Sequence, residues 1–295
     1  GLLSVQRILD NMRVVDGGRR LAFHAKLVET LYHLFYRRAA MFRAVYQHTT
    51  VVGVELMLRA ALTHLFCARN FMLLRDAVTS RSVEPYLMLD DTLLQQARTV
   101  LHYCSAEERE RDANLAHACD LVDRIERRDL YRCVARATVS AKEWNMLAAS
   151  ARTSTALKSF QWVPREVHDL LMASKARPLH VHEPLALHTS RFHYGNGDRD
   201  PLDNVFVFDW RQPERVSRCS AREKTRMRPR RWCEYTVRVY AKFHVDEICA
   251  AAIEHSLEVF LRNALAECKA SGAQDADESA SDAESLRPPH KRQKT

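Results

Sequence analysis

Apolar residues recur every three to four positions over most of the first half of the chain, and this period predicts amphipathic helices. The longest run extends from about 26 to 74, with breaks expected near Thr49 and Thr50 or at Asn70. Two further helical stretches are predicted over 83–104, with Asp90 or Asp91 as N-cap, and over 106–134. A short helix over 4–15 precedes them and leads through a turn at 16–18 into a brief strand over 19–23.

The pattern changes after about residue 138, where prolines separate short runs with alternating polarity. Runs such as 177–188 and 204–210 suit half-buried strands, and 233–245 is the clearest strand. A strongly amphipathic helix follows, with Asp246 as its N-cap. The sequence therefore predicts an α+β fold that is mainly α. A helical body occupies 1–138, a smaller α+β lobe occupies 139–270, and a disordered polar tail occupies 271–295.

Composition favours a folded protein with a sizeable core and anionic partners, and it disfavours a disulfide scaffold or a membrane-spanning chain. The 295 residues are 46% hydrophobic, enough for a sizeable core, and the net charge of +8 favours anionic partners. The eight cysteines form no CxxC pair, which favours reduced core residues over a zinc site or a disulfide scaffold. No apolar run reaches about eighteen residues, so we expect no membrane span. Because the chain starts with Gly, we expect it to be part of a longer protein.

Polar side chains are concentrated in the middle of the longest predicted helix. Arg38, Phe42 and Tyr46 are spaced by four residues and share one face, and Gln47 and His48 follow directly. A guanidinium beside a phenol and an amide suits a phosphate clamp in a cavity. The alternative is an ordinary helix whose Arg reaches solvent and whose Tyr packs in the core.

Four blocks of the chain resemble the vertebrate SAM-and-HD-domain deoxynucleoside triphosphate triphosphohydrolases in the same order and with similar gaps. They are "LYHLFYRRAAMFRAVYQHTTVVGVELML" at 31–58, "IERRDLYRCV" at 125–134, "DPLDNVFVFDWRQPERVSR" at 200–218 and "VRVYAKFHVDE" at 237–247. The resemblance implies the later helices of an HD-type body. It also implies a parent reaction in which water cleaves a dNTP into deoxynucleoside and triphosphate at a divalent or iron-type metal.

The resemblance implies that Arg38, Tyr46 and Gln47 line the substrate pocket. Phe42 stands where the family has a His that approaches the reacting phosphate. The loss of such a group is typically worth about 10²–10⁴ in rate. The metal ligands of the family match no segment of this chain, so we expect no metal site in it and no turnover by the chain alone.

A second set of positions matches the family's allosteric pockets, which bind GTP or dGTP and a dNTP and join dimers into a tetramer. The matching residues are Arg7, Lys26, His48, Arg128, Arg132 and Lys242. The positions of His24, Thr30, Ala44 and Thr49 depart from the family's basic or amide residues, so about half the charge is missing. The alternative for each cation is a solvated helix face.

The remaining features favour other partners or none. The run at 211–231 has nine Arg or Lys against two Glu, flanked by Trp210 and Trp232, and suits RNA or single-stranded DNA as well as a solvated loop and helix face. We interpret His168 with Asp169 as a helix-surface pair, and His180 and His182 near Glu183 as strand residues and not metal ligands. The end at 288–295 suits a nuclear import signal. The rival hypothesis is a basic nucleic-acid or partner-binding module without catalysis.

Overall fold

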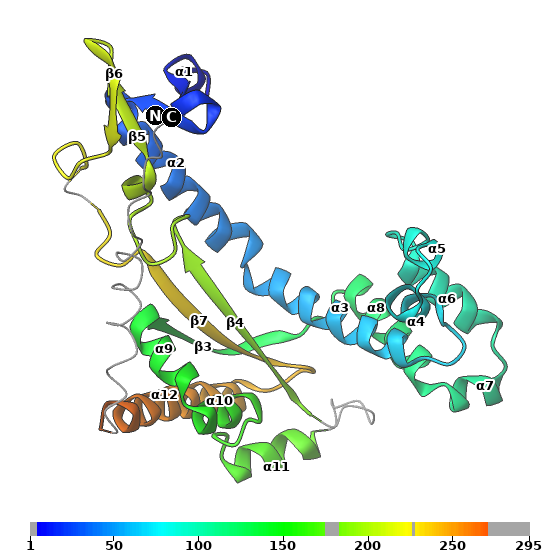
Figure 1. Cartoon of the computed structure of the whole chain (residues 1–295). Helices are drawn as coiled ribbons and strands as arrows, with labels where there is room; N and C mark the ends of the chain where they lie inside the picture. Colours follow the sequence, from blue (N-terminus) through cyan, green and yellow to red (C-terminus); the bar gives the residue numbers. More distant parts are fainter. Residues whose placement is uncertain (1–4, 175–182, 226–227, 271–295) are drawn as a thin grey trace, which may run out of the picture.

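A long helical arm connects three packed groups of elements in the structure, a computed structural model that describes residues 5–174, 183–225 and 228–270 (Figure 1). The predicted class, α+β and mainly α, is confirmed. The predicted tail at 271–295 and its basic end lie outside the described residues.

The first group, here called the head, is a four-stranded sheet packed against α1 (Val5–Asp10) and the start of the arm. Its strands are β1 (Met12–Val15), β2 (Arg20–His24), β5 (Phe206–Asp209) and β6 (Gln212–Arg218), in the order β1-β2-β5-β6. β2 and β5 are parallel, and the two outer pairs are antiparallel. The strands predicted at 19–23 and 204–210 are thus confirmed, and they join one sheet from two distant parts of the chain.

The arm consists of α2 (Val28–Met41), a π-helical turn η3 (Phe42–Tyr46) and α3 (Thr49–Cys67), and it leads away from the head (Figure 1). A 3₁₀ turn, η2 (Ala25–Leu27), connects it to β2. The predicted break lies at Gln47 and His48, next to the expected Thr49. There the imidazole of His48 accepts the backbone N–H of Thr50 as an N-cap.

The second group, the helical body, forms around the second half of α3. It contains α4 (Leu73–Thr79), α5 (Glu84–Leu87), α6 (Leu93–Tyr103), α7 (Ala106–Arg111) and α8 (Ala113–Glu126). Met57 and Leu65 of α3 pack with Leu115 of α8, all fully buried. By length and composition α3 would suffice to cross a membrane. A buried core helix passes the same test, and α3 packs against α8.

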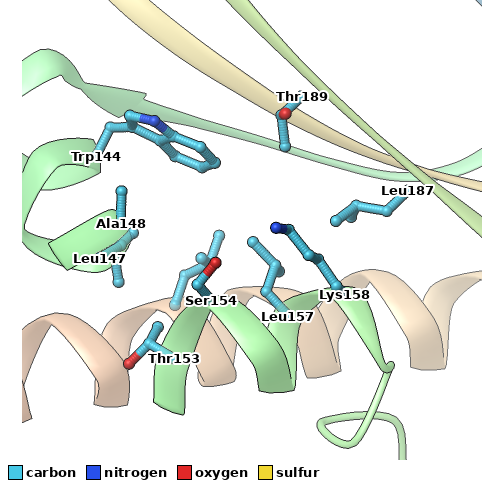
Figure 2. Close-up of a pocket in the computed structure, with 10 residues that line it drawn as sticks. Trp144, Leu147, Ala148, Thr153, Ser154, Leu157, Lys158, Leu187 and Thr189 are labelled. Atoms are coloured by element: carbon cyan, nitrogen blue, oxygen red, sulfur yellow. The ribbon is translucent and has the colours of Figure 1, made fainter. Parts of the chain in front are cut away.

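The third group, the C-terminal lobe, has an antiparallel sheet in the order β3-β7-β4, formed by β3 (Arg132–Ser140), β7 (Cys233–Ala241) and β4 (Leu185–His193). Its core face is covered by α9 (Ala141–Ala149), α10 (Ala151–Lys158), α11 (Arg165–Ala173) and α12 (Glu247–Ala270). The predicted cap is confirmed, because Asp246 accepts the N–H of Cys249 at 2.7 Å. A cavity of about 290 Å³ remains beneath β4 (Figure 2).

Three predictions about secondary structure were wrong. The helix predicted over 4–15 ends at Asp10, and β1 and the start of β3 are strands within the residues 1–138 that were predicted as a helical body with one brief strand. The helix predicted over 106–134 ends at Glu126, because Arg128 adopts a left-handed conformation (φ 63°) and the chain then enters β3. The lobe contains three unpredicted helices, α9 to α11. Ser140 and Glu143 form a capping box at the start of α9, a local signal that the proline-based interpretation overlooked.

The cysteines follow the prediction. All eight are free, and five are buried: Cys119, Cys219, Cys233, Cys249 and Cys268. Burial raises the pKa of the Cys119 thiol to about 11, so this side chain is a neutral packing group.

Candidate functional site

Most of the predicted allosteric cations surround one junction, where the start of α3 meets the ends of β3 and β7. The hydroxyl of Tyr240 donates to the carbonyl of Thr49 at 3.1 Å, which fixes the first turn of α3 on β7. Arg132 opens β3 and pairs in register with Ala241, the last residue of β7. Lys242 follows directly, and His48 caps the helix. The structure thus places the backbones of His48, Arg128, Arg132 and Lys242 near the same junction. The side chain of Arg132, in register with Ala241, lies on the sheet face opposite that of Tyr240.

A buried arginine holds the loop that carries Arg128. Arg124, only 4% exposed, donates from Nε to Asp129 at 2.7 Å and from Nη2 to the carbonyl of Lys242 at 2.8 Å. Its guanidinium also lies 5.7 Å from the centre of the Tyr131 ring. Arg128 itself is exposed, at the left-handed position where glycine is favoured. That conformation costs about 1–2 kcal/mol, so the chain keeps an exposed cation here at a cost in stability.

The local chemistry of the junction suits phosphate oxygens. Burial lowers the pKa of Lys242, partly opposed by the charge of Glu183, so its ammonium has lost hydration that an anion would replace. Because Nδ1 of His48 accepts the N–H of Thr50, the neutral ring carries its proton on Nε2 and remains a donor there. The N-terminal end of the 19-residue helix α3 adds positive potential at the same place.

The other two allosteric positions are remote from this junction. Arg7 lies on α1, and Lys26 lies in η2 directly before α2, both in the head. The 14 residues of α2 separate them from the junction, a length of about 21 Å at 1.5 Å per residue. One triphosphate bound to a single chain therefore cannot contact both groups of cations.

The three spaced residues of the arm do share a face, as the spacing predicts. The guanidinium of Arg38 lies 4.5 Å from the centre of the Phe42 ring, and the rings of Phe42 and Tyr46 are 5.1 Å apart. Arg38 also donates to the carbonyl of His193 at 3.3 Å. Tyr46 is 53% exposed, so this phenol is not a core residue. The side-chain oxygen of Gln47 is buried without a hydrogen-bond partner among the described residues.

In this ladder, the rings of Phe42 and Tyr46 are tilted by 58° to one another, and neither predicted alternative for the arm residues holds in full. Arg38 does not stand alone in solvent, because its guanidinium covers the ring of Phe42. Cation–π contacts of this kind contribute about 0.5–1 kcal/mol at exposed sites. Phe42 therefore positions the guanidinium of Arg38.

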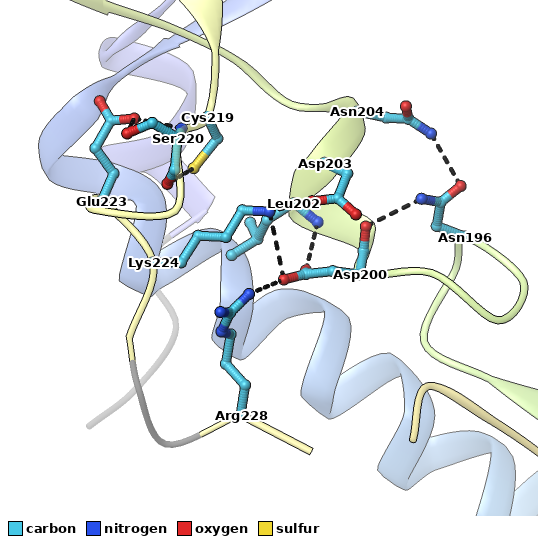
Figure 3. Close-up of polar contacts among 10 residues, drawn as sticks. All are labelled: Asn196, Asp200, Leu202, Asp203, Asn204, Cys219, Ser220, Glu223, Lys224 and Arg228. Carbon is cyan, nitrogen blue, oxygen red and sulfur yellow. Dashed lines mark hydrogen bonds and ion pairs between the residues drawn. The ribbon is translucent and has the colours of Figure 1, made fainter. Parts of the chain in front are cut away.

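The basic run at 211–231 divides into a buried part and an exposed part. Asp200, 6% exposed, forms ion pairs with Lys224 at 3.5 Å and with Arg228, and Lys224 also pairs with Asp203 (Figure 3). These two cations hold the segment onto η4 (Pro201–Asn204) and are not free to bind a partner. The exposed part includes Arg211, Arg215, Arg218, Arg222, Arg230 and Arg231. The predicted helix face is absent from the described part of this run, where β6 occurs instead.

The two flanking tryptophans have different surroundings. Trp210 is 57% exposed and packs edge-on against Phe208, with ring centres 5.1 Å apart. Trp232 is half-buried and packs edge-on against Tyr194 at 5.2 Å. Only Trp210 therefore presents a large part of its ring to a base.

The histidine candidates provide no metal site in the described ranges. His168 and Asp169 lie 3.9 Å apart on the exposed surface of α11, where Asp169 also lies 3.9 Å from Arg165. His180 and His182 lie outside the described residues, and Glu183 is exposed beside them in sequence. Among residues 5–174, 183–225 and 228–270, no group of three or more His, Cys, Asp or Glu side chains is placed to hold a metal ion.

Sequence reasoning missed several of the residues that organise these sites, namely Arg124, Arg238, Asp200 and Asp203. Arg238 is 3% exposed, and its Nε and Nη1 have no hydrogen-bond partner in the described part of the chain. It stands in register between Arg136 and His188 on the sheet face that also carries Tyr240. A charged residue inside an otherwise apolar strand is the signal that marks such a position.

Comparison with known proteins gives a distant relationship. No protein-family model matches the chain. The deoxynucleoside triphosphate triphosphohydrolase SAMHD1 of Gallus gallus is 23% identical over 266 residues, which cover 86% of this chain and 39% of the relative. The protein of the same name from Danio rerio is 23% identical over 260 residues, or 86% of this chain and 38% of the relative. The Xenopus laevis protein is 22% identical over 242 residues, or 80% and 36%. The chain is thus a divergent relative of these proteins and spans less than two fifths of their length.

Proposed function

We propose that this chain, a divergent relative of the SAMHD1 triphosphohydrolases, binds the triphosphate group of a nucleotide at the junction of α3, β3 and β7. In this proposal it serves as the C-terminal part of a dNTP triphosphohydrolase-like protein. The observation that carries the proposal is the position of Arg128 and Lys242 close to a helix N-terminus whose cap, His48, keeps a donor on its outer nitrogen, with Arg132 at the adjoining end of β3. Three cations, a helix dipole and an imidazole donor match the charge and the many acceptors of a triphosphate.

The same proposal assigns Arg7 and Lys26 to a second copy of the chain. Because α2 separates them from the junction, they can contact the same nucleotide only when another subunit brings its head to this surface. The relatives are named as deoxynucleoside triphosphate triphosphohydrolases, so we expect the bound nucleotides to be triphosphates, with GTP or dGTP and a dNTP as activators. The nucleotide would then stabilise a dimer or tetramer by binding the assembled state more tightly than the separate chains.

The substrate side of the proposal rests on the ladder of Arg38, Phe42 and Tyr46, with Gln47 beside it. These residues would form one wall of a dNTP pocket, and Tyr46 is exposed enough to contact a sugar or base. Phe42 provides neither a proton nor a charge to a reacting phosphate. We therefore expect the chain alone to release no triphosphate from dGTP with Mg²⁺ or Mn²⁺, and release that requires the metal would overturn this part.

Nucleotide binding at the junction is tested with a fluorescent dGTP analogue and anisotropy. The double variant R132Q/K242Q removes two cations without touching the backbone bonds that Lys242 forms, and we expect at least about 10-fold weaker binding. The matched control is R165Q, which removes an arginine that is 92% exposed on α11. Unchanged affinity in the folded double variant would refute the site.

The role of the second copy has its own readout. Sedimentation with and without dGTP should show larger species only with the nucleotide, and K26Q should reduce this assembly. If K26Q changes neither assembly nor nucleotide affinity while R132Q/K242Q abolishes binding, the junction binds a nucleotide within one chain and the two-copy arrangement is wrong.

A second candidate function is binding to RNA or single-stranded DNA through the head. The exposed ring of Trp210 beside Arg211 favours it, since base stacking on an aromatic ring is worth about 1–3 kcal/mol per base. Filter binding of a single-stranded oligonucleotide at low and physiological salt should show a steep loss of affinity with salt. The variant W210A should weaken binding, while W232A tests the packed tryptophan. For this function we also propose nuclear localisation, directed by the basic residues at 288–295.

A further inference from the structure

The cavity beneath β4 in the C-terminal lobe takes no part in the functions proposed above. α12 packs chiefly on β3, at the opposite edge of the sheet from β4, and α9 packs on β3 and β7, so the helices leave a space under β4. The cavity measures about 290 Å³, close to the lower end of the range of about 300–1,000 Å³ for ligand pockets. Its apolar wall consists of Leu147, Leu157, Leu187 and Leu261.

Two polar groups converge on this apolar space. The Lys158 ammonium and the Ser154 hydroxyl, both on α10, point from the helix toward Thr189 on β4 (Figure 2). Lys158 is exposed at the mouth of the cavity, and in the part of the chain that the structure describes it has no ion-pair partner. The ring of Trp144 closes one end of the space and is stacked on Tyr235, with ring centres 5.0 Å apart and planes at 11°. The walls are therefore mostly apolar, with one cation, the hydroxyls of Thr153, Ser154 and Thr189, and a rigid aromatic wall.

We propose that this cavity binds a small carboxylic acid with an apolar body, such as an aryl-alkanoic acid. One ammonium and one hydroxyl match the single charge and two oxygens of a carboxylate. A phosphate carries more charge than this one ammonium neutralises, and the leucine walls offer its further oxygens no donors. The leucine walls and the indole of Trp144 bury the body of the ligand.

The test uses 3-phenylpropionate as the probe and ligand-observed NMR or calorimetry on the full chain. The acid should bind saturably, and its neutral amide and acetate should bind much more weakly, because one lacks the charge and the other lacks the apolar body. K158M keeps the apolar stem and removes the charge, so we expect a loss of about 10-fold for the acid and little change for the amide. K142M, an exposed lysine on α9 outside the cavity, should bind like the wild type.

The variant L187W tests whether the acid binds in this cavity or elsewhere on the surface. A bulkier side chain fills the space from β4, so binding of the acid should be lost while the circular dichroism and melting of the chain stay close to wild type. Should the acid bind L187W or K158M as tightly as the wild type, the proposal is refuted. Lack of saturable binding by folded wild type also refutes it. The dGTP assay with R132Q/K242Q is independent of each of these outcomes, so the two proposals can fail separately.

Discussion

The head and the C-terminal lobe are both small sheets packed against helices, yet different interactions hold them together. In the lobe, Val237 and Val239 of β7 pack on Ile253 and Leu257 of α12, and all four are fully buried. In the head, the long segment after β6 is held by Asp200 and its two cations. Periodic apolar residues specify the first arrangement, whereas the second depends on single charges far apart in sequence. The lobe should therefore resist single polar changes that unfold the head.

The largest expected effect comes from removing the Asp200 carboxylate, which tests whether this ion-pair network stabilises the head and not the lobe. D200A leaves Lys224, 9% exposed, without the partner that shares its buried surroundings. Loss of one partner of a buried ion pair costs about 3–5 kcal/mol. We expect urea unfolding, followed by hydrogen exchange, to show early opening of η4, β5 and the start of α2, while α12 stays protected. D198A, an exposed neighbour, is the control and should change stability by about 0.5 kcal/mol or less.

A double variant separates the charge from the shape of that contact. Replacing buried ion pairs by apolar residues of similar volume is often neutral or stabilising. D200L/K224M should therefore recover much of the stability that D200A loses. A double variant as unstable as D200A would show that hydrogen bonds of Asp200, such as the one from the Leu202 N–H at 2.9 Å, matter more than the ion pair.

The corresponding change in the lobe is L257A. Leu257 is fully buried, with 0% of its surface accessible, in the core between α12 and β7. Truncation of such a side chain costs about 2–5 kcal/mol, and we expect about 3 because α12 has neighbours on several sides. Here the exchange-protected amides of β3, β7 and α12 should open first, and the head should be unaffected. E258A on the exposed side of the same helix is the control, and equal losses in the two variants would contradict the assigned core.

Sequence reasoning could predict the lobe's sheet strand β7 and helix α12 because their apolar periods are long and regular. It also located the break between α2 and α3 and the strands β2 and β5 of the head. It could not predict the end of α8, which depends on the left-handed Arg128 and on the hydrogen bond from Arg124 to the Lys242 carbonyl, just after β7 and 118 residues away. The sequence also did not predict the ion pairs of Asp200 with Lys224 and Arg228, because these residues are far apart along the chain. The grouping of Arg128, Arg132 and Lys242 needed the pairing of β3 with β7, which no local pattern encodes.

The junction between the arm and the lobe is tested by a change that normally stabilises a helix. Gly53 lies inside α3, and a Cβ atom there would lie 2.8 Å from the carbonyl oxygen of Tyr131. In an open helix, Gly to Ala gains about 1 kcal/mol. G53A should instead lose about 1–2 kcal/mol through overpacking and loosen the contact between α3 and Tyr131. Thermal unfolding measures the effect, and a higher melting temperature for G53A would show that α3 and β3 do not approach this closely.

The smallest expected effect concerns the capping box of α9, whose contribution to the stability of the lobe should depend on pH. The Ser140 hydroxyl and backbone N–H both donate to the Glu143 carboxylate, at 2.6 and 2.7 Å, and these bonds lower the pKa of Glu143. A lowered pKa in the folded state means that the stabilisation is complete above the unfolded value of about 4.3 and is lost as pH falls through the folded value. E143Q should therefore cost about 1 kcal/mol near neutral pH and progressively less as the medium becomes acidic. Unfolding free energies of E143Q and wild type at about pH 7 and about pH 3 provide the measurement. A difference that stays constant between them would assign the stability of α9 to its apolar contacts, as in the rest of the lobe, and not to the charge at its cap.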